Sequence, residues 1–496
     1  MAPSRAGRVG PRPARCGLVH RAPAACLRRH RPTASQRSRG RASGMRRRLL
    51  EPPRRPLQCR ETCRLPQAPA RVLVWRNMST PLELDATGQA QLVASKQISA
   101  TELIDLAIAA VGKVNPQLNA VIHPRFERAR DEAKKGRSGT FAGVPIVVKD
   151  LNCQIKGEPY HLGTRFLKNR KFVATEDSYL YERLCRAGFI TIGRTNVPEF
   201  GSTITTEPLA YGPARNPWNT DHSTGGSSGG SAATVAAGCV AVAHANDGGG
   251  SIRIPASECG LVGLKPSKGR VSLGPALGES WIGGVVEGCV TRSVRDTAAV
   301  MDAIGGYEPG DPNTPPPPSR PYADEVGAPV GKLRVGLLSG ALLPGGLDHP
   351  EARASVAATG KLLESLGHHV EVTHPVALND ADFGDMFLAI VIAHIANDVA
   401  ALEKQFGVSL STDDIEPGNH LMAQFGNVTN VVAYLTAVGW MQAWTRKVVS
   451  WWLPRDGSQG FDVLVTPTLA GPPPKIGALS GDDSTDRIRE IMQYTA

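Results

Sequence analysis

The 496-residue sequence lacks several patterns that would assign it to a common class of protein. Neither G-x-x-x-x-G-K-[ST] nor G-x-G-x-x-G fits its glycine clusters, which argues against a phosphate-binding loop. No apolar run is long enough to predict a transmembrane span, and the N-terminal segment has no apolar centre of the kind found in secretory signal peptides. The five cysteines after residue 77 have no zinc-binding spacing, so we expect no metal site there.

Lysine is absent from residues 1–77, which contain 20 Arg and only two acidic residues. The segment carries +18, and its difference from the net +11 of the whole chain leaves −7 for the remainder. Because it is rich in Pro and Ala without apolar periodicity, we expect a disordered leader. Three interpretations stay open: an organelle transit peptide, a nucleic-acid-binding arm, or a translation start further downstream, at Met78 or Met45.

The cysteines of the remainder indicate a reducing compartment. All five lie in apolar surroundings, which is typical of buried thiols: Cys153, Cys185, Cys239, Cys259 and Cys289. We therefore expect a cytoplasmic protein, with a mitochondrial location as the alternative if the leader is a transit peptide.

Two glycine-rich loops, each containing serine, are the most informative stretch. They read GGSSGG at 225–230 and DGGGSIR at 247–253. The small apolar residues between them predict a helix of about 10 residues that begins at residue 231, then a buried strand at 240–245. Glycines let backbone N–H groups converge on one ligand atom, and a serine among such groups is a candidate nucleophile. Glycine content alone is equally compatible with two flexible turns.

A continuous apolar run precedes these loops. The sequence VPIVVKD at 144–150 is typical of a strand buried on both faces, with Lys149 at its end. A lysine at the end of a strand is usually solvated. Lys149 would work as a base only if it were desolvated, because burial disfavours the ammonium and lowers its pKa.

Further elements alternate between helix and strand. Ser99 and Glu102 form a capping-box pattern for a helix that we expect to stop at Pro116. The remaining expectations are helices at 178–187 and 349–366, strands at 189–196, 333–340, near Val370 and at 463–467, and an exposed proline-rich loop at 309–321. The pattern predicts an α/β fold with a largely parallel sheet flanked by helices.

A helical region at 382–452 carries Trp440, Trp444 and Trp451 at spacings of 4 and 7. We expect these rings to pack against the sheet. A wall of a substrate funnel and a contact with a membrane surface remain alternatives.

One loop also satisfies the G-x-S-x-G pattern of α/β-hydrolases, through Gly225, Ser227 and Gly229. That nucleophile elbow must follow a strand, whereas the preceding NPWNTDHST is rich in turn residues and predicts none. The flanking His222 and His244 have no ligand spacing and are expected to be structural.

The motifs GVPIVVKD, GGSSGG and DGGGSIR, in this order, resemble the amidase signature family, which uses a Ser-cisSer-Lys triad. The resemblance covers most of residues 78–496. It implies a single domain with a mixed, largely parallel β-sheet core flanked by helices. It also implies that Lys149 is the lysine of the triad, Ser227 the serine with the cis peptide bond, and Ser251 the nucleophile.

Further roles follow from the same resemblance. It implies an oxyanion hole built from the backbone of Gly248, Gly249 and Gly250 together with Ser251. Three residues are expected to support it: Ser228, Asp247 and Arg253.

The resemblance implies hydrolysis of carboxamides to carboxylate plus ammonia or amine through an acyl-serine, with a small-molecule substrate and neither cofactor nor metal. HANDGGGSIRIPASECG is more similar to bacterial general amidases and cyclic-dimer nylon-oligomer hydrolases than to the glutamyl-tRNA(Gln) amidotransferase A-type subunit. That amidotransferase chain stays an alternative, as do an α/β-hydrolase and an inactive fragment with an RNA-binding basic arm. We expect no membrane span and no nucleic acid on the folded domain, and a homodimer is one option.

Family members continue past the point that corresponds to the final IMQYTA of this sequence. We therefore expect a chain truncated at its C-terminus. Such a truncation would leave a sheet edge uncovered.

Overall fold

The computed structural model describes residues 80–495 except 339, 344, 482 and 483. The predictions made for the leader, residues 1–77, lie outside the described residues. The domain boundary predicted after residue 77 stays a prediction.

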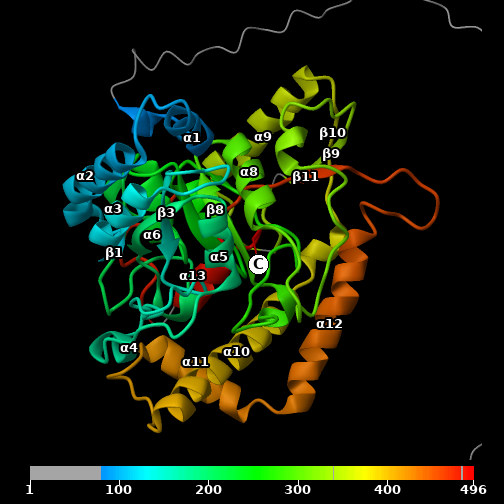
Figure 1. Ribbon diagram of the computed structural model, residues 1–496. Coiled ribbons are helices and arrows are strands. Elements are labelled where there is room, and N and C mark those ends of the chain that lie inside the picture. Colours follow the sequence, from blue (N-terminus) through cyan, green and yellow to red (C-terminus); the bar gives the residue numbers. More distant parts are fainter. Residues whose placement is uncertain (1–79, 339, 344, 482–483, 496) are drawn as a thin grey trace, which may run out of the picture. The chain divides into compact units, whose positions relative to one another are not determined.

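A six-stranded sheet in the order β1-β3-β2-β6-β8-β7 organises the described residues (Figure 1). Its three central strands, β3, β2 and β6, are parallel, whereas β1, β8 and β7 pair antiparallel with their neighbours. The strands are β1 Val121–Pro124, β2 Pro145–Lys149, β3 Ile190–Thr195, β6 Val242–Asp247, β7 Val262–Gly263 and β8 Val286–Thr291. The predicted α/β fold with a mixed sheet is confirmed.

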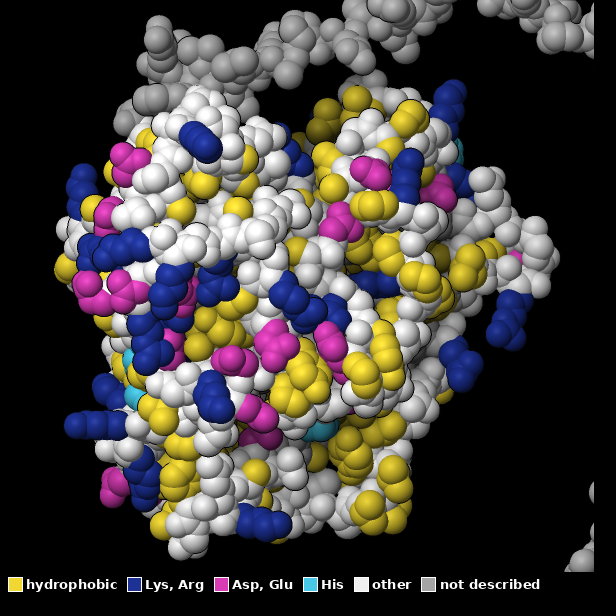
Figure 2. All heavy atoms as spheres, in the orientation of Figure 1, with side chains coloured by type: hydrophobic (Ala, Val, Ile, Leu, Met, Phe, Trp, Pro, Cys, Tyr) yellow, Lys and Arg dark blue, Asp and Glu magenta, His cyan; other side chains and the backbone are white. Residues whose placement is uncertain are grey.

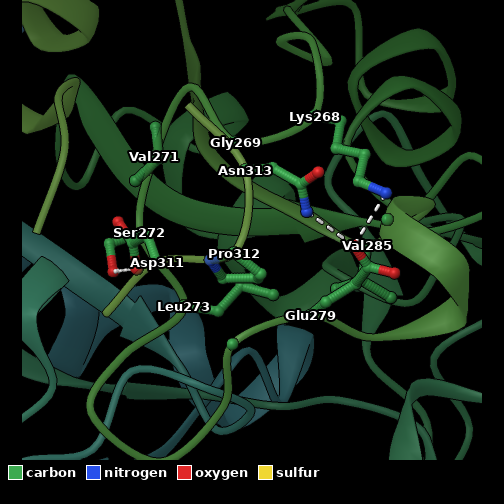
Figure 3. A pocket seen from close by; sticks show the side chains of 12 residues that line it. Lys268, Gly269, Val271, Ser272, Leu273, Glu279, Val285, Asp311, Pro312 and Asn313 are labelled. Atoms are coloured by element: carbon green, nitrogen blue, oxygen red, sulfur yellow. Dashed lines mark hydrogen bonds and ion pairs between the residues drawn. The ribbon is translucent and has the colours of Figure 1, made fainter. Parts of the chain in front are cut away.

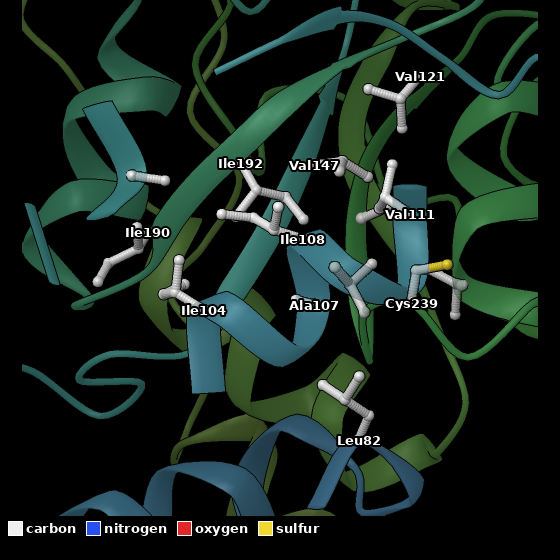
Figure 4. Close-up of a cluster of buried hydrophobic side chains, with 14 of the residues drawn as sticks. Leu82, Ile104, Ala107, Ile108, Val111, Val121, Val147, Ile190, Ile192 and Cys239 are labelled. Carbon is white, nitrogen blue, oxygen red and sulfur yellow. The ribbon is translucent and has the colours of Figure 1, made fainter. Parts of the chain in front are cut away.

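The apolar runs form strands that are buried on both faces. Every residue of β2, β3, β6 and β8 is buried. Successive side chains of a strand point to opposite faces. Val147 accordingly packs in one cluster, with α2 Ala100–Leu118, while Ile146 and Val148 pack in a second, with α5 Tyr179–Arg186 and α8 Val294–Ile304. Figure 4 shows the first cluster, whose members include Ile104, Ala107, Ile108 and Val111 of α2 and Val121, Ile190 and Ile192 of the sheet.

Helix α2, Ala100–Leu118, begins at the predicted capping box. The Glu102 N–H donates to Ser99 Oγ at 3.1 Å, and the Ser99 N–H donates to Glu102 Oε2 at 2.8 Å. The predicted end at Pro116 is wrong, because the helix continues to Leu118. Pro116 lies in the last turn, where its missing N–H removes a single helical bond, and Asn119 ends the helix in the left-handed conformation.

Two boundaries around the glycine-rich stretch differ from the prediction. Helix α6, Gly229–Ala236, begins two residues earlier than expected and includes Gly229 and Gly230, where a side chain would collide with Thr206 and with the backbone of Asn196. Strand β6 begins at Val242 and extends to Asp247, because its antiparallel pairing with β8 continues to that residue. This extension places two polar residues, Asn246 and Asp247, at the end of β6.

A short hairpin precedes GGSSGG, which corrects the expectation that NPWNTDHST contains no strand. β4 Arg215–Asn216 pairs antiparallel with β5 Asn219–Ser223. Most of the side chains of β5 are exposed, so the hairpin is held by backbone pairing and carries no apolar alternation that the sequence could show.

The remaining elements agree with the predicted alternation of helix and strand. Parallel strands form a second sheet in the order β10-β9-β11, against which α9 packs. The elements not yet placed are α1 Ala86–Ala94, α3 Phe126–Lys135, α4 Arg165–Asn169, α7 Arg253–Glu258, β9 Arg334–Leu337, α9 Pro350–Ser365, β10 His369–Val372, β11 Val463–Val465 and α13 Ser484–Ile491.

Three helices, α10 Phe383–Phe406, α11 Pro417–Val428 and α12 Val431–Val449, build the region that contains the tryptophans. Trp444 contacts Phe383 of α10, with ring centroids 4.6 Å apart, and stacks with Trp440 at 6.2 Å. The prediction that these two rings pack on the sheet is therefore wrong, because α12 packs on α10 instead. Trp451 stacks on Phe461 at 4.1 Å and lies against Gly336 of the second sheet.

Helix α10 is long and apolar enough to cross a membrane by length and composition alone, with a mean hydropathy of 1.6, although the sequence analysis found no such run. Its buried side chains, Val391, Ile395 and Val399, pack with Phe166 and Leu167 of α4 in a hydrophobic cluster. Where α11 meets α12, hydrophobic side chains are exposed, and Figure 2 shows such side chains at the lower right. They are Leu421, Phe425, Val428, Val431, Val432 and Leu435.

Candidate active site

Lys149 is the centre of a buried polar site at the end of β2. Its Nζ donates to Ser227 Oγ at 2.7 Å and to Asn246 Oδ1 at 2.6 Å. Asn246 lies on β6, the neighbouring parallel strand, and its Nδ2 donates to Leu151 O, which fixes the amide with its oxygen toward the lysine. Because parallel strands end at the same edge of a sheet, β2 and β6 bring these side chains together.

The environment of Lys149 favours its neutral form. Burial lowers the pKa of Lys149 to about 7, although the negative charges of Glu287 and Asp247 oppose that shift. The side chain is fully buried, so water cannot solvate an ammonium there. A lysine with this pKa can accept a proton near neutral pH.

Ser227 lies in the loop between β5 and α6. The peptide bond between Gly226 and Ser227 is cis, as the resemblance implies. A side chain at Gly226 would collide with the backbone of Thr205, and one at Gly225 with Pro255 of α7. The GGSSGG loop is therefore packed directly against the helix that follows Ser251.

The second glycine loop is held by Asp247. Oδ1 accepts from the Gly250 N–H at 2.7 Å, and Oδ2 accepts from the N–H groups of Ile252 at 3.1 Å and Arg253 at 3.3 Å. Both oxygens also accept from the Arg253 guanidinium at 2.8 Å. Burial alone would raise the pKa of Asp247, but Arg253 and the loop amides hold it below its ordinary value.

The amides of this loop divide into two groups. The Gly250 N–H is bonded to Asp247, whereas those of Gly248, Gly249 and Ser251 donate to no protein atom in the described part of the chain. Ser251 is half-buried and follows Gly250, whose φ of +133 favours glycine. The loop thus offers backbone donors around the serine.

Aromatic side chains cover the same loop. A side chain at Gly248 would meet the ring of Trp281, and one at Gly249 would meet Phe387 of α10 and Met492. The Trp281 and Phe387 rings contact edge to face, with centroids 6.0 Å apart. Arg253 Nη2 also donates to Thr495 O at 2.7 Å, so residues 492–495 lie beside the loop.

A small cavity of ≈ 20 Å³ is lined in part by Val285, a residue that a side chain at Gly248 would contact (Figure 3). Its polar side chains are paired with one another: Glu279 Oε2 accepts from Lys268 Nζ and from Asn313 Nδ2, each at 2.7 Å. This volume holds about one water molecule, so the cavity is no substrate site.

The sequence-predicted residues therefore fall into two connected groups. Lys149 contacts Ser227 directly, and Ser228 Oγ donates to Asn246 O at 3.3 Å. Asp247, the next residue of β6, holds the loop from Gly248 to Arg253. His222 lies apart from both groups, with Nδ1 2.8 Å from Pro473 O.

Comparison with known proteins decides the family. The Amidase family profile matches residues 102–496. The chain belongs to the amidase family. This amidase is 42% identical to the 6-aminohexanoate-cyclic-dimer hydrolase of Pseudomonas sp. (strain NK87) over 404 residues, 81% of each chain.

A solved structure, 6-aminohexanoate cyclic dimer hydrolase complexed with substrate, has a TM-score of 0.78 and 41% identity, and the match covers 81% of this chain and 83% of that one. The A-type subunit of glutamyl-tRNA(Gln) amidotransferase from Synechococcus sp. (strain WH7803) is 34% identical, over 82% of this chain and 86% of the relative. The protein is an enzyme that hydrolyses amide bonds, and its family excludes the α/β-hydrolase alternative.

Three buried residues of this amidase escaped the sequence analysis as members of the site. Asn246 accepts from Lys149 at 2.6 Å, and it lies just beyond the strand predicted at 240–245. His244 was expected to be structural, and its Nδ1 accepts from the Lys149 N–H at 3.2 Å, so this structural residue lies beside the lysine. Glu287, on β8, contacts His244, and the sequence analysis predicted no strand at 286–291.

Proposed function

We propose that this amidase cleaves carboxamide C–N bonds through an acyl-serine formed on Ser251. The observation that carries the proposal is the buried Lys149, with its pKa of about 7 and its Nζ 2.7 Å from Ser227 Oγ. A neutral amine in that position can receive a proton from a serine hydroxyl without a histidine.

The first half-reaction uses the two serines in sequence. Ser251 Oγ attacks the carbonyl carbon while its proton passes to Ser227 Oγ, whose own proton moves to Lys149 Nζ. When the C–N bond breaks, the leaving nitrogen takes a proton back along the same route and departs as ammonia or an amine. Water then attacks the acyl-serine, gives up its proton by the same path, and releases the carboxylate.

The oxyanion of each tetrahedral intermediate needs backbone donors. The N–H groups of Gly248, Gly249 and Ser251 have no partner among the described residues and can supply them, whereas the Gly250 N–H is occupied by Asp247. Gly250 thus contributes to the loop by its conformation. Asp247 and Arg253 position the donors, and Ser228 supports the strand end through Asn246 O.

The family and the relatives support a proposal for the substrate class. We propose small linear or cyclic carboxamides as substrates. The support is that a solved structure with 41% identity is 6-aminohexanoate cyclic dimer hydrolase complexed with substrate. The aromatic cover from Trp281 and Phe387 supports substrates with an apolar carbon chain or ring.

The test is labelling of the protein with a fluorophosphonate probe, followed by turnover of an anilide, a small primary carboxamide and 6-aminohexanoate cyclic dimer. We expect Ser251→Ala to abolish both labelling and turnover in a protein that still folds, and Lys149→Ala to reduce both. Ser458→Ala, an exposed serine near the end of the chain, is the matched control. Full turnover by folded Ser251→Ala would contradict the proposal.

We further propose a cytoplasmic protein, because Cys153, Cys185, Cys239, Cys259 and Cys289 are all free thiols. Fractionation of cells that express the full chain tests this: recovery in an organelle fraction would contradict it. The oligomeric state stays a prediction.

A further inference from the structure

A buried acid–base pair lies beside Lys149 without touching the serines. His244 Nε2 is 2.6 Å from Glu287 Oε2, and the two side chains are only 1% and 2% exposed. They lie on the antiparallel neighbours β6 and β8, where Glu287 is directly opposite Asn246. The pair therefore lies next to Asn246, the residue of β6 that accepts a hydrogen bond from Lys149.

The hydrogen bonds fix the tautomer of His244. Because the Lys149 N–H donates to His244 Nδ1, this nitrogen is an acceptor and the ring proton is on Nε2. Nε2–H then donates to Glu287 Oε2 at 2.6 Å. Burial lowers the pKa of His244 although Glu287 opposes the shift, which agrees with a neutral ring.

This arrangement is costly as packing alone. Glu287 Oε1 is buried and has no hydrogen-bond partner among the described residues. A buried carboxylate without full compensation is expensive, and an apolar side chain of similar size would stabilise the strand more. The carboxylate therefore calls for a role beyond packing.

The other acids near Lys149 are already neutralised by arginine. Asp150 pairs with Arg194 at 3.0 Å, and Asp247 pairs with Arg253 at 2.8 Å. Glu287 has a neutral imidazole as its partner and no arginine or lysine in a salt bridge within the described residues. The charged and titratable groups that face Lys149 are Asp150, Arg194, His244, Asp247 with its Arg253, Lys265 at the Asp247 carbonyl, and Glu287.

We propose that Glu287, held in place through His244, is the counter-charge that stabilises protonated Lys149 in each half-reaction. Glu287 is a positioning residue, since it contacts neither the serines nor the loop amides. The inference rests on the proposed function, in which Lys149 becomes an ammonium while fully buried. The negative charge is present before the proton arrives, so no reorganisation is needed at that moment.

The direction of the effect on pH dependence follows from the sign of the charge. Glu287 raises the pKa of Lys149 and so opposes the lowering by burial. Without that charge, Lys149 loses its proton at a lower pH, and the acid limb of kcat/KM moves to lower pH. The same change makes Lys149 a weaker proton acceptor, so the plateau rate falls.

Glu287→Gln tests this, because the Gln Oε1 still accepts from His244 Nε2–H while the charge is removed. The measurement is kcat/KM for an anilide across the pH range, together with a thermal melt. We expect the acid limb to shift down by about 0.5–1.5 pH units. The plateau should fall by roughly 3–30-fold, as a similar change in lysine basicity implies. The ratio of variant to wild-type activity therefore rises as the pH falls, which a structural defect does not produce.

Asp296→Asn is the matched control, since Asp296 is another buried acid whose oxygens bind the N–H groups of Ala86 and Thr87 on α1. Its removal is expected to lower stability and leave the acid limb where the wild type has it. An unshifted limb in folded Glu287→Gln would overturn the inference, as would an equal shift in Asp296→Asn.

A second variant keeps the test decisive if Glu287→Gln does not fold. His244→Asn removes the Nε2–H donor, so the isolated buried carboxylate takes up a proton and the limb shifts in the same direction. A wild-type limb in His244→Asn overturns the inference. Failure of the proposed function gives a different result, because Ser251→Ala and Lys149→Ala would then keep wild-type probe labelling. If Ser251→Ala is inactive but the acid limb of Glu287→Gln is not shifted, the proposed function stands and only the counter-charge role of Glu287 is overturned.

Discussion

The Asp247 carboxylate accepts a 2.7 Å hydrogen bond from the Gly250 N–H, so the last residue of β6 shapes the turn that presents Ser251. The same carboxylate binds Arg253 on the other side of the serine. The backbone before and after Ser251 is thus tied to one side chain.

We expect Asp247→Asn to lower kcat by about 10²–10³-fold, the range observed when oxyanion donors are lost. The amide can accept fewer of the loop N–H bonds and carries no charge for Arg253. Steady-state kinetics with an anilide measures the loss. Asp385→Asn, which removes the exposed partner of Arg489, should keep wild-type kinetics. Equal kcat in both variants would show that Asp247 does not hold the loop.

Activity should rise with pH through the pKa of Lys149, which burial lowers to about 7. The lysine accepts a proton only in its neutral form, so kcat/KM falls on the acid side of that value. A pH–rate profile in buffers of constant ionic strength measures the limb. A limb set near the pKa of an ordinary carboxylate, far below 7, would point to a different base.

Lys149→Met should reduce kcat by about 10²–10⁴-fold, the usual contribution of a general base. Its stability should change in the opposite direction, because methionine fills the space without a buried amine. A thermal melt at neutral pH is expected to show a Tm at least equal to that of the wild type. A clear drop in Tm would mean that the hydrogen bonds to Ser227 and Asn246 contribute more stability than the buried amine costs.

The lowered pKa of Lys149 also predicts that the stability of the wild type depends on pH, and Lys149→Met is the comparison that tests it. Lys149 has its pKa lowered from 10.5 to about 7 in the folded chain. Between those values the unfolded chain binds the extra proton, so wild-type stability rises with pH, by up to about 1.4 kcal/mol per pH unit. Chemical unfolding of Lys149→Met and wild type should show a gap that widens as the pH falls from 10.5 toward 7 and then stays constant. A gap that does not depend on pH would contradict burial of the lysine.

The glycines of the loop should differ in tolerance. Gly250 has a φ of +133, and a side chain there would lie 2.5 Å from Ile254, whereas one at Gly249 meets flexible ends of Met492 and Phe387 at 3.2 Å. We expect Gly250→Ala to lower the free energy of unfolding by about 1–3 kcal/mol and Gly249→Ala by less than about 1 kcal/mol. Denaturant unfolding of both variants makes the comparison. Equal losses of unfolding free energy in the two variants would contradict the conformational role assigned to Gly250.

Local signals in the sequence sufficed for the central strands and for the main contact of the site. VPIVVK is apolar throughout because β2 is buried on both faces, and the family motifs bring Lys149 and Ser227 into one site. What escaped prediction depends on partners distant in the chain. Glu287 gains its place only through pairing of β8 with β6, and Trp444 packs on α10 because of how α12 crosses it.

Arg253 binds Thr495 O across 242 residues of sequence. At about 5–20 residues per second, a ribosome needs roughly 10–50 seconds to add that length of chain. The nascent enzyme therefore carries a finished β6 well before residue 495 emerges to complete the guanidinium contacts beside Ser251. The contact with Thr495 is therefore made late in biosynthesis, after the rest of the described fold has been synthesised.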